Sequence, residues 1–109
     1  LLKQCADDPE LVEELLGLFA AGLDAAAAAL THAINANDRE TWRRAAHKLR
    51  GEAATLGFQR LASVLQRLES RATSPGQTVP DDLRDALAEA TTGCHRWLHR
   101  RSQEVLRDR

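Results

Sequence analysis

The sequence predicts an all-α fold, and specifically an antiparallel four-helix bundle. Hydrophobic residues make up 43% of the 109 residues, yet only 4% are aromatic, and there are only three prolines and six glycines. With its many alanines, this composition favours helices over strands. Four amphipathic stretches follow one another with short breaks, and such helices pack most simply as an antiparallel bundle. We expect one domain, 1–109, with helices at about 9–35, 39–56, 58–73 and 80–106.

The first predicted helix begins at Asp8-Pro9 and ends near Asn35. Asp8 is a suitable N-cap, and Pro9 fits the first helical position, where its missing N–H costs nothing. The alanine run 25–29 is expected to be helical, with small side chains that let a neighbouring helix approach closely. Apolar residues at helical spacing predict the buried stripe, namely Leu11, Leu15, Leu18, Phe19, Gly22, Ala26, Ala29, Leu30 and Ala33.

The second and third predicted helices are joined by a connection of only two or three residues, so they should be antiparallel neighbours. Asp38 can cap the second helix, and Gly57 is its stop signal. The expected core face of the second helix is Trp42, Ala45, Ala46, Leu49, Ala53 and Leu56. That of the third is Leu61, Val64, Leu65, Leu68 and Ala72.

The fourth predicted helix follows the one clear loop, residues 73–80. Pro80 lies near its start, and Asp81 and Asp82 suit the positive end of its dipole. Its expected apolar stripe is Leu83, Leu87, Ala90, Cys94, Trp97, Leu98 and Val105.

The second helix carries a histidine on the face opposite its apolar stripe. Arg43, His47, Arg50, Gly51 and Ala54 recur three or four residues apart and share that face. Lys48 and Arg44 lie beside it. We interpret this pattern as an exposed imidazole surrounded by cations, which suits it to accept an anionic group.

Gly51 needs a reason of its own, because glycine inside a helix costs about 1 kcal/mol relative to alanine. The pattern continues through Glu52 and Ala53, so Gly51 does not end the helix. One turn from His47, it leaves bare backbone where a second protein could reach the imidazole ring. We therefore interpret it as an access position.

These residues resemble the histidine-phosphotransfer (HPt) domain family. The family pattern is a His, any residue, Leu, a basic residue and Gly, then a Leu-Gly turn into another helix. The chain has His47-Lys48-Leu49-Arg50-Gly51, then Leu56-Gly57, Leu61 and Leu68-Glu69. The resemblance covers the length of the domain and is most specific over residues 38–69. Glu52 departs from it, because a small residue is usual there.

The resemblance implies a phosphorelay carrier that accepts a phosphoryl group on His47 from a receiver-domain aspartate and passes it to another. A neutral imidazole has a lone pair for attack on phosphorus, and Lys48 and Arg50 can offset the added negative charge. Arg43, Arg44 and Ala54 are candidates for a docking rim. The sequence has no Gly-rich phosphate loop and no Walker lysine. The resemblance therefore implies that a receiver domain, the expected partner, supplies the phospho-aspartate and the magnesium ion, and that this chain binds no cofactor.

Two other functional classes remain open. One is the phospho-accepting domain of a sensor or chemotaxis-type histidine kinase, which would make a kinase a second partner. The sensor-kinase pattern has an acidic residue after the His and Thr or Asn four residues on, whereas this chain has Lys48 and Gly51. The other class is a helical interaction module with an inert His47.

A second cluster, Cys94, His95 and His99, raises the question of a metal site. His95 and His99 are four residues apart and could share a metal on one helical face. Cys94 belongs to the apolar stripe, and no acidic third ligand is near in the sequence. We expect no metal site here.

The remaining properties narrow the choice of partners and compartment. The net charge is −1, and the basic residues Arg96, Arg100 and Arg101 make too small a patch for nucleic acid. We interpret the two cysteines, Cys5 and Cys94, as reduced thiols. No apolar run appears long enough for a membrane span. We expect a monomer without membrane contact, in the cytoplasm or as the cytoplasmic part of a membrane-bound kinase.

Overall fold

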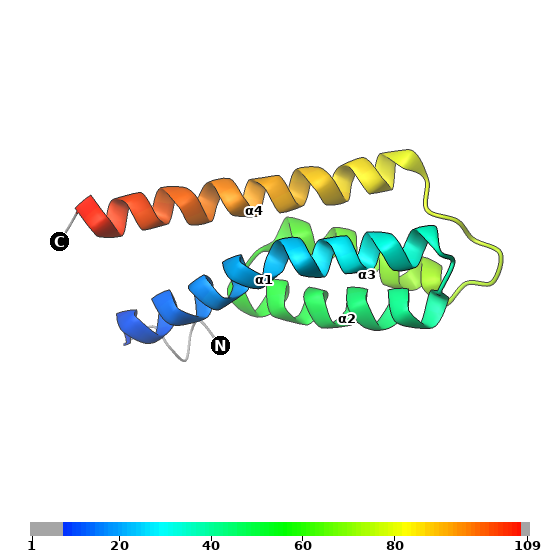
Figure 1. Cartoon of the computed structure of the whole chain (residues 1–109), viewed down its shortest axis with the longest axis horizontal. Coiled ribbons are helices and arrows are strands. Elements are labelled where there is room, and N and C mark those ends of the chain that lie inside the picture. Colours follow the sequence, from blue (N-terminus) through cyan, green and yellow to red (C-terminus); the bar gives the residue numbers. More distant parts are fainter. Residues whose placement is uncertain (1–7, 108–109) are drawn as a thin grey trace.

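The chain folds as the antiparallel four-helix bundle that the sequence predicts (Figure 1). The computed structural model describes residues 8–107, and these form four α-helices and no strand. The helices are α1 (Pro9–Asn35), α2 (Arg39–Leu56), α3 (Gln59–Ala72) and α4 (Asp81–Arg107). Each helix runs opposite to the one before it, and contacts join α1 to α2, α2 to α3, α3 to α4, and α4 back to α1.

Local capping signals set the ends of the first two helices at the predicted residues. The Asp8 carboxylate accepts a hydrogen bond from the Leu11 N–H at 3.1 Å, and that of Asp38 accepts one from the Thr41 N–H at 3.3 Å. Gly57 follows α2 with a φ of 89°, in the left-handed region that glycine adopts without strain.

The other two helices begin one residue later than predicted. The Phe58 N–H donates to the Ala53 carbonyl at 2.8 Å, so Phe58 belongs to the turn that ends α2 and not to α3. The Pro80 carbonyl accepts from Leu83 and Arg84, which places Pro80 just before the first helical residue. At their other ends α3 stops one residue before the prediction, at Ala72, and α4 continues one residue further, to Arg107.

The predicted core faces of α2, α3 and α4 are largely confirmed. Trp42 is only 1% exposed, and its indole N–H donates to the Leu68 carbonyl at 2.9 Å. All five predicted stripe residues of α3 are buried, as are Leu83, Leu87, Ala90, Cys94 and Leu98 of α4. Burial raises the pKa of the Cys94 thiol. Val105 and Cys5 lie outside the residues whose side chains are described.

The predicted buried stripe of α1 is wrong in part. Leu18 is 66% exposed and Leu11 is 38% exposed, and Gly22 and Ala29 are also exposed. The buried residues are Leu16, Phe19, Leu23, Leu30, Ala33 and Ile34. The helix has two sets of apolar residues, offset from each other by one position, which corresponds to a rotation of about 100° around the helix axis. Periodicity in the sequence cannot decide which set faces the core. Packing against α2 and α4 selects the face of Leu16 and Leu23, and leaves a leucine stripe at the surface.

The expectation that no apolar run reaches the length of a membrane span is also wrong. By length and composition, α1 could cross a membrane. Five of its large apolar side chains nevertheless lie in the core shared by the four helices, namely Leu16, Phe19, Leu23, Leu30 and Ile34. Core packing accounts for that part of its apolar character.

Aromatic residues close the core at the α2–α3 turn. Phe19 stacks on Phe58 with centroids 5.2 Å apart, and Phe58 meets Trp97 edge to face at 5.4 Å. Trp97, predicted to be core, is 42% exposed because it covers this end of the core. Beyond the turn, α1 and α4 continue (Figure 1), and Arg101 pairs with Glu13 at 2.7 Å.

Candidate functional site

His47 lies midway along α2 with 62% of its side chain exposed. Its neighbours Ala46 and Leu49 are buried on the opposite side of the helix. The predicted placement of the imidazole, away from the apolar face, is therefore confirmed.

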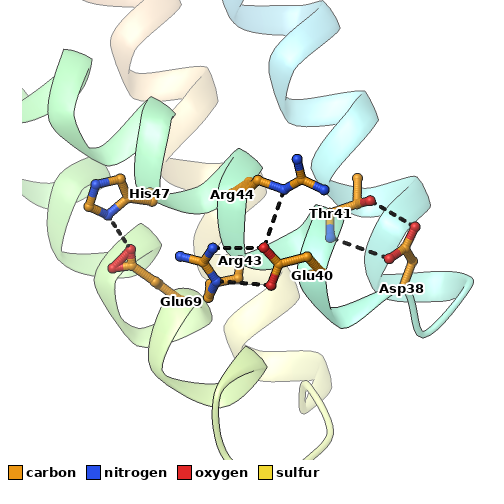
Figure 2. Close-up of polar contacts among 7 residues, drawn as sticks. All are labelled: Asp38, Glu40, Thr41, Arg43, Arg44, His47 and Glu69. Carbon is orange, nitrogen blue, oxygen red and sulfur yellow. Dashed lines mark hydrogen bonds and ion pairs between the residues drawn. The ribbon is translucent and has the colours of Figure 1, made fainter.

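Glu69 of α3 holds the imidazole of His47. The two side chains point toward one another (Figure 2), with His47 Nδ1 2.7 Å from Glu69 Oε2. The Glu69 side chain is only 18% exposed, so its carboxylate has little freedom to turn elsewhere. An ionised carboxylate can only accept hydrogen bonds. In the neutral imidazole, Nδ1 then carries the proton, which leaves the lone pair on Nε2.

Arg50 completes this group by pairing with the same carboxylate. Its Nη2 lies 3.4 Å from Glu69 Oε1 and 3.3 Å from His47 Nδ1. Because Nδ1 and Nη2 are both donors in this tautomer, they share Glu69 as acceptor and do not bond to each other. Arg50 therefore lies on the Nδ1 side of the ring.

Two more of the predicted cations near His47, Arg43 and Arg44, pair with Glu40 (Figure 2). Arg43 makes a two-pronged pair with the Glu40 carboxylate, at 2.8 and 3.2 Å, and Arg44 approaches it at 3.4 Å. The hydrogen bond from Arg43 lowers the pKa of Glu40, and the same bond raises the pKa of Arg43. Acidic partners therefore offset three of the cations expected around His47, namely Arg43, Arg44 and Arg50.

Lys48 and Gly51 lie on the other side of His47, along a groove between α1 and α2. The groove has a volume of about 720 Å³ and is lined by Leu15, Leu18, Phe19, His47, Lys48, Gly51, Glu52, Thr55 and Leu56. Among the described residues, Lys48 has no ion pair. A Cβ added at Gly51 would have no atom within 4 Å, so packing gives no reason for glycine there. Ala54 is exposed further along the helix.

Glu69 was not among the site residues predicted from the sequence, although it belongs to the pattern that carries the resemblance. A signal for it existed. His47 lies eleven residues before Phe58 and Glu69 lies eleven residues after it. Residues equidistant from the turn of an antiparallel helical hairpin lie at similar levels, so an acid here could have been placed beside the histidine.

The fold brings an acid to the second histidine cluster from a distant part of the chain. His95 Nε2 lies 2.8 Å from Asp24 Oδ1 of α1, 71 residues away in the sequence. His99 lies 3.5 Å from the Gln103 amide, and Cys94 is buried. Over the part of the chain that the structure describes, no three potential metal ligands gather in one place.

Comparison with known proteins identifies the family. The family model for the Hpt domain matches residues 14–96, which include His47, its partner Glu69 and the groove between α1 and α2. No curated protein and no solved structure matched the chain at a significant level. A family match over most of the chain, on a bundle of four helices, shows its membership. The chain belongs to the Hpt domain family, whose role is histidine phosphotransfer in two-component signalling.

Proposed function

We propose that this chain is a phosphorelay carrier whose acceptor atom is Nε2 of His47. The observation that carries the proposal is the hydrogen bond between Nδ1 and Glu69, at 2.7 Å. It holds the proton on one ring nitrogen and leaves the lone pair on the other, on a side chain that is 62% exposed. A partner protein can therefore reach a nucleophile in a defined tautomer.

The proposed step is a transfer between two residues on different proteins. The Nε2 lone pair attacks the phosphorus of a receiver's aspartyl phosphate, and the bond from phosphorus to the aspartate oxygen breaks. The aspartate leaves as a carboxylate, and the proton stays on Nδ1. Positive charge grows on the ring as the new bond forms, and the Glu69 carboxylate stabilises it. The return step to a second receiver is the same reaction in reverse.

The geometry supports different roles for the two cations proposed to stabilise phosphate. Lys48 lies along the open groove without an ion pair in the described part of the chain, so its ammonium can reach a phosphoryl group on Nε2. Arg50 lies on the Nδ1 side with Glu69, at 3.4 Å. We assign phosphate stabilisation to Lys48, and to Arg50 mainly the positioning of Glu69. Arg43, Arg44 and Ala54 are left as the docking rim.

The partner in this proposal is a receiver domain, with a histidine kinase as a further partner. Receivers and kinases are the proteins with which Hpt domains interact. Phosphoryl transfer needs in-line geometry and charge neutralisation, and the magnesium ion expected on the receiver would supply part of the latter. We expect the carrier to act in the cytoplasm as a monomer. Sedimentation at micromolar concentration would test the oligomeric state.

The deciding experiment incubates the chain with a receiver domain phosphorylated by acetyl phosphate and follows acid-labile label. We expect the wild type to take the label and His47→Gln to take none while keeping its fold, because the ring is exposed. His32→Gln and His99→Gln, at two other exposed histidines, are the matched controls and should label normally. Label on His47→Gln would contradict the proposed acceptor. Label from a kinase core with ATP, but from no receiver, would favour the kinase-domain alternative.

A further inference from the structure

The groove beside His47 has one wall of apolar residues and a charged residue that the proposed transfer does not use. Leu15, Leu18 and Phe19 form the α1 wall, and Leu18 is 66% exposed. The α2 wall contributes Lys48 and Glu52, one turn apart. Glu52 is exposed and also lines the adjoining groove further along α1, together with Lys48.

The Glu52 carboxylate has no partner of its own among residues 8–107. No hydrogen bond or ion pair of Glu52 occurs in that range, whereas Glu13, Glu40, Glu69 and Glu89 all pair with arginines. Lys48, one turn before Glu52, is the cation that lines the same groove. The proposed function assigns Lys48 to the phosphoryl group, and one ammonium cannot fully neutralise both anions.

A receiver that delivers phosphate to Nε2 must cover this groove, a step that rests on the proposed function. Glu52 lies five residues beyond His47, which is about 7.5 Å along the helix axis. The receiver surface would then remove water from the Glu52 carboxylate, in the groove that the exposed Leu18 also lines. Removing water from a charge is costly unless the partner provides an opposite charge.

We propose that Glu52 is a specificity-determining residue for the choice of receiver. A receiver with a lysine or arginine facing Glu52 pairs with it and docks. A receiver with an apolar or acidic residue there leaves the carboxylate unpaired or repelled, and is rejected. The carboxylate therefore adds attraction for one set of partners and a penalty for the others.

The test measures kcat/KM for transfer from a panel of purified receiver domains, each phosphorylated with acetyl phosphate. Glu52→Gln keeps the size of the side chain and removes the charge. We expect Glu52→Gln to lower kcat/KM about tenfold with the fastest receiver and to raise kcat/KM with the slowest ones. The range of kcat/KM values across the panel should therefore narrow. Glu52→Lys should reorder the receivers. Glu104→Gln, which removes an exposed carboxylate from α4 outside the groove, should leave every rate unchanged.

Two outcomes would overturn the proposal. Glu52→Gln could leave the range of kcat/KM values across the panel unchanged, or it could change kcat/KM by the same factor for every receiver. The effect should also shrink at high ionic strength, because salt screens charges at the edge of an interface. Labelling of His47 by a small phosphoramidate separates this proposal from the function itself. If the wild type labels with phosphoramidate but with no receiver in the panel, the proposed function fails together with this inference. If receivers transfer normally and the range of kcat/KM values is unchanged, only the role of Glu52 fails.

Discussion

Nδ1 of His47 lies 2.7 Å from Oε2 of Glu69, although 22 residues separate the two along the chain. The short turn at Gly57 folds α3 back beside α2 and brings the acid to the ring. Glu69, from α3, gives Nδ1 of His47 a hydrogen-bond acceptor that its neighbours in α2 do not provide. In the neutral imidazole this acceptor favours the proton on Nδ1.

Removing the Glu69 carboxylate should slow transfer to His47 without removing the acceptor. A hydrogen bond to a charged group contributes about 1.5–3 kcal/mol, which corresponds to a fall of roughly 10- to 100-fold in rate if it acts fully in the transition state. We expect Glu69→Ala to show that fall in kcat and Glu69→Gln a smaller one, because the amide oxygen can still accept from Nδ1.

Nitrogen NMR of His47 separates positioning from a general loss of structure. Glu69→Ala should mix the two neutral tautomers, whereas the wild type should hold the proton on Nδ1. Glu89→Ala, which breaks the exposed pair with Arg60 at 3.2 Å, is the matched control and should change neither rate nor tautomer. A wild-type rate in Glu69→Ala would show that the pair has no part in the transfer.

Substitution of Gly51 should separate stability from access. Nothing lies within 4 Å of a Cβ placed there, so Gly51→Ala should stabilise the protein by up to about 1 kcal/mol. Gly51→Gln should also fold, yet its side chain would obstruct a receiver approaching His47. Transfer from a receiver should therefore fall steeply, while labelling by a small phosphoramidate falls much less.

Gly93 provides the control for Gly51. It is an exposed helical glycine of α4 with the same open surroundings. Gly93→Gln should leave both labelling reactions unchanged. If Gly51→Gln received phosphate from a receiver at the wild-type rate, the access explanation would be wrong and the glycine would need another.

The purified chain should not label itself from ATP and magnesium. Its sequence contains no nucleotide-binding motif, so we expect these 109 residues to depend on a phosphorylated donor and not on ATP. Incubation with radiolabelled ATP, with a histidine-kinase core added in a parallel sample, is the measurement. Acid-labile label in the sample without any partner would contradict this prediction.

The N-cap of α2 should make part of the stability depend on pH. The side-chain hydrogen bond from Thr41, at 2.8 Å, is the main cause that lowers the pKa of Asp38 in the folded protein. The folded state then favours the ionised form. The contribution of ionised Asp38 to stability is complete above the pKa of the unfolded state, about 3.9. It is lost as pH falls through the lower pKa of the folded state.

Asp38→Asn keeps a good N-cap residue and removes the titration. We expect its free energy of unfolding in urea to fall less than that of the wild type between neutral pH and pH of about 3. Equal losses in the two proteins would show that Asp38 does not contribute to the acid sensitivity.

Much of the fold could be predicted because its signals are local. Asp8, Asp38 and Gly57 fix helix ends through hydrogen bonds within one turn, and those ends were found at the predicted residues. The exposure of His47 follows from its position opposite Trp42 and Leu49 on one helix, which needs no knowledge of the other three.

The tertiary structure alone decided the features that depend on distant segments. It chose between the two apolar faces of α1, because that choice depends on where α2 and α4 pack. It paired His47 with Glu69 and placed Leu18 at the surface, in the groove that His47 also lines. Helical periodicity records which residues share a face, but it holds no information about which neighbour covers that face. That neighbour is set by the packing of helices far apart in the chain.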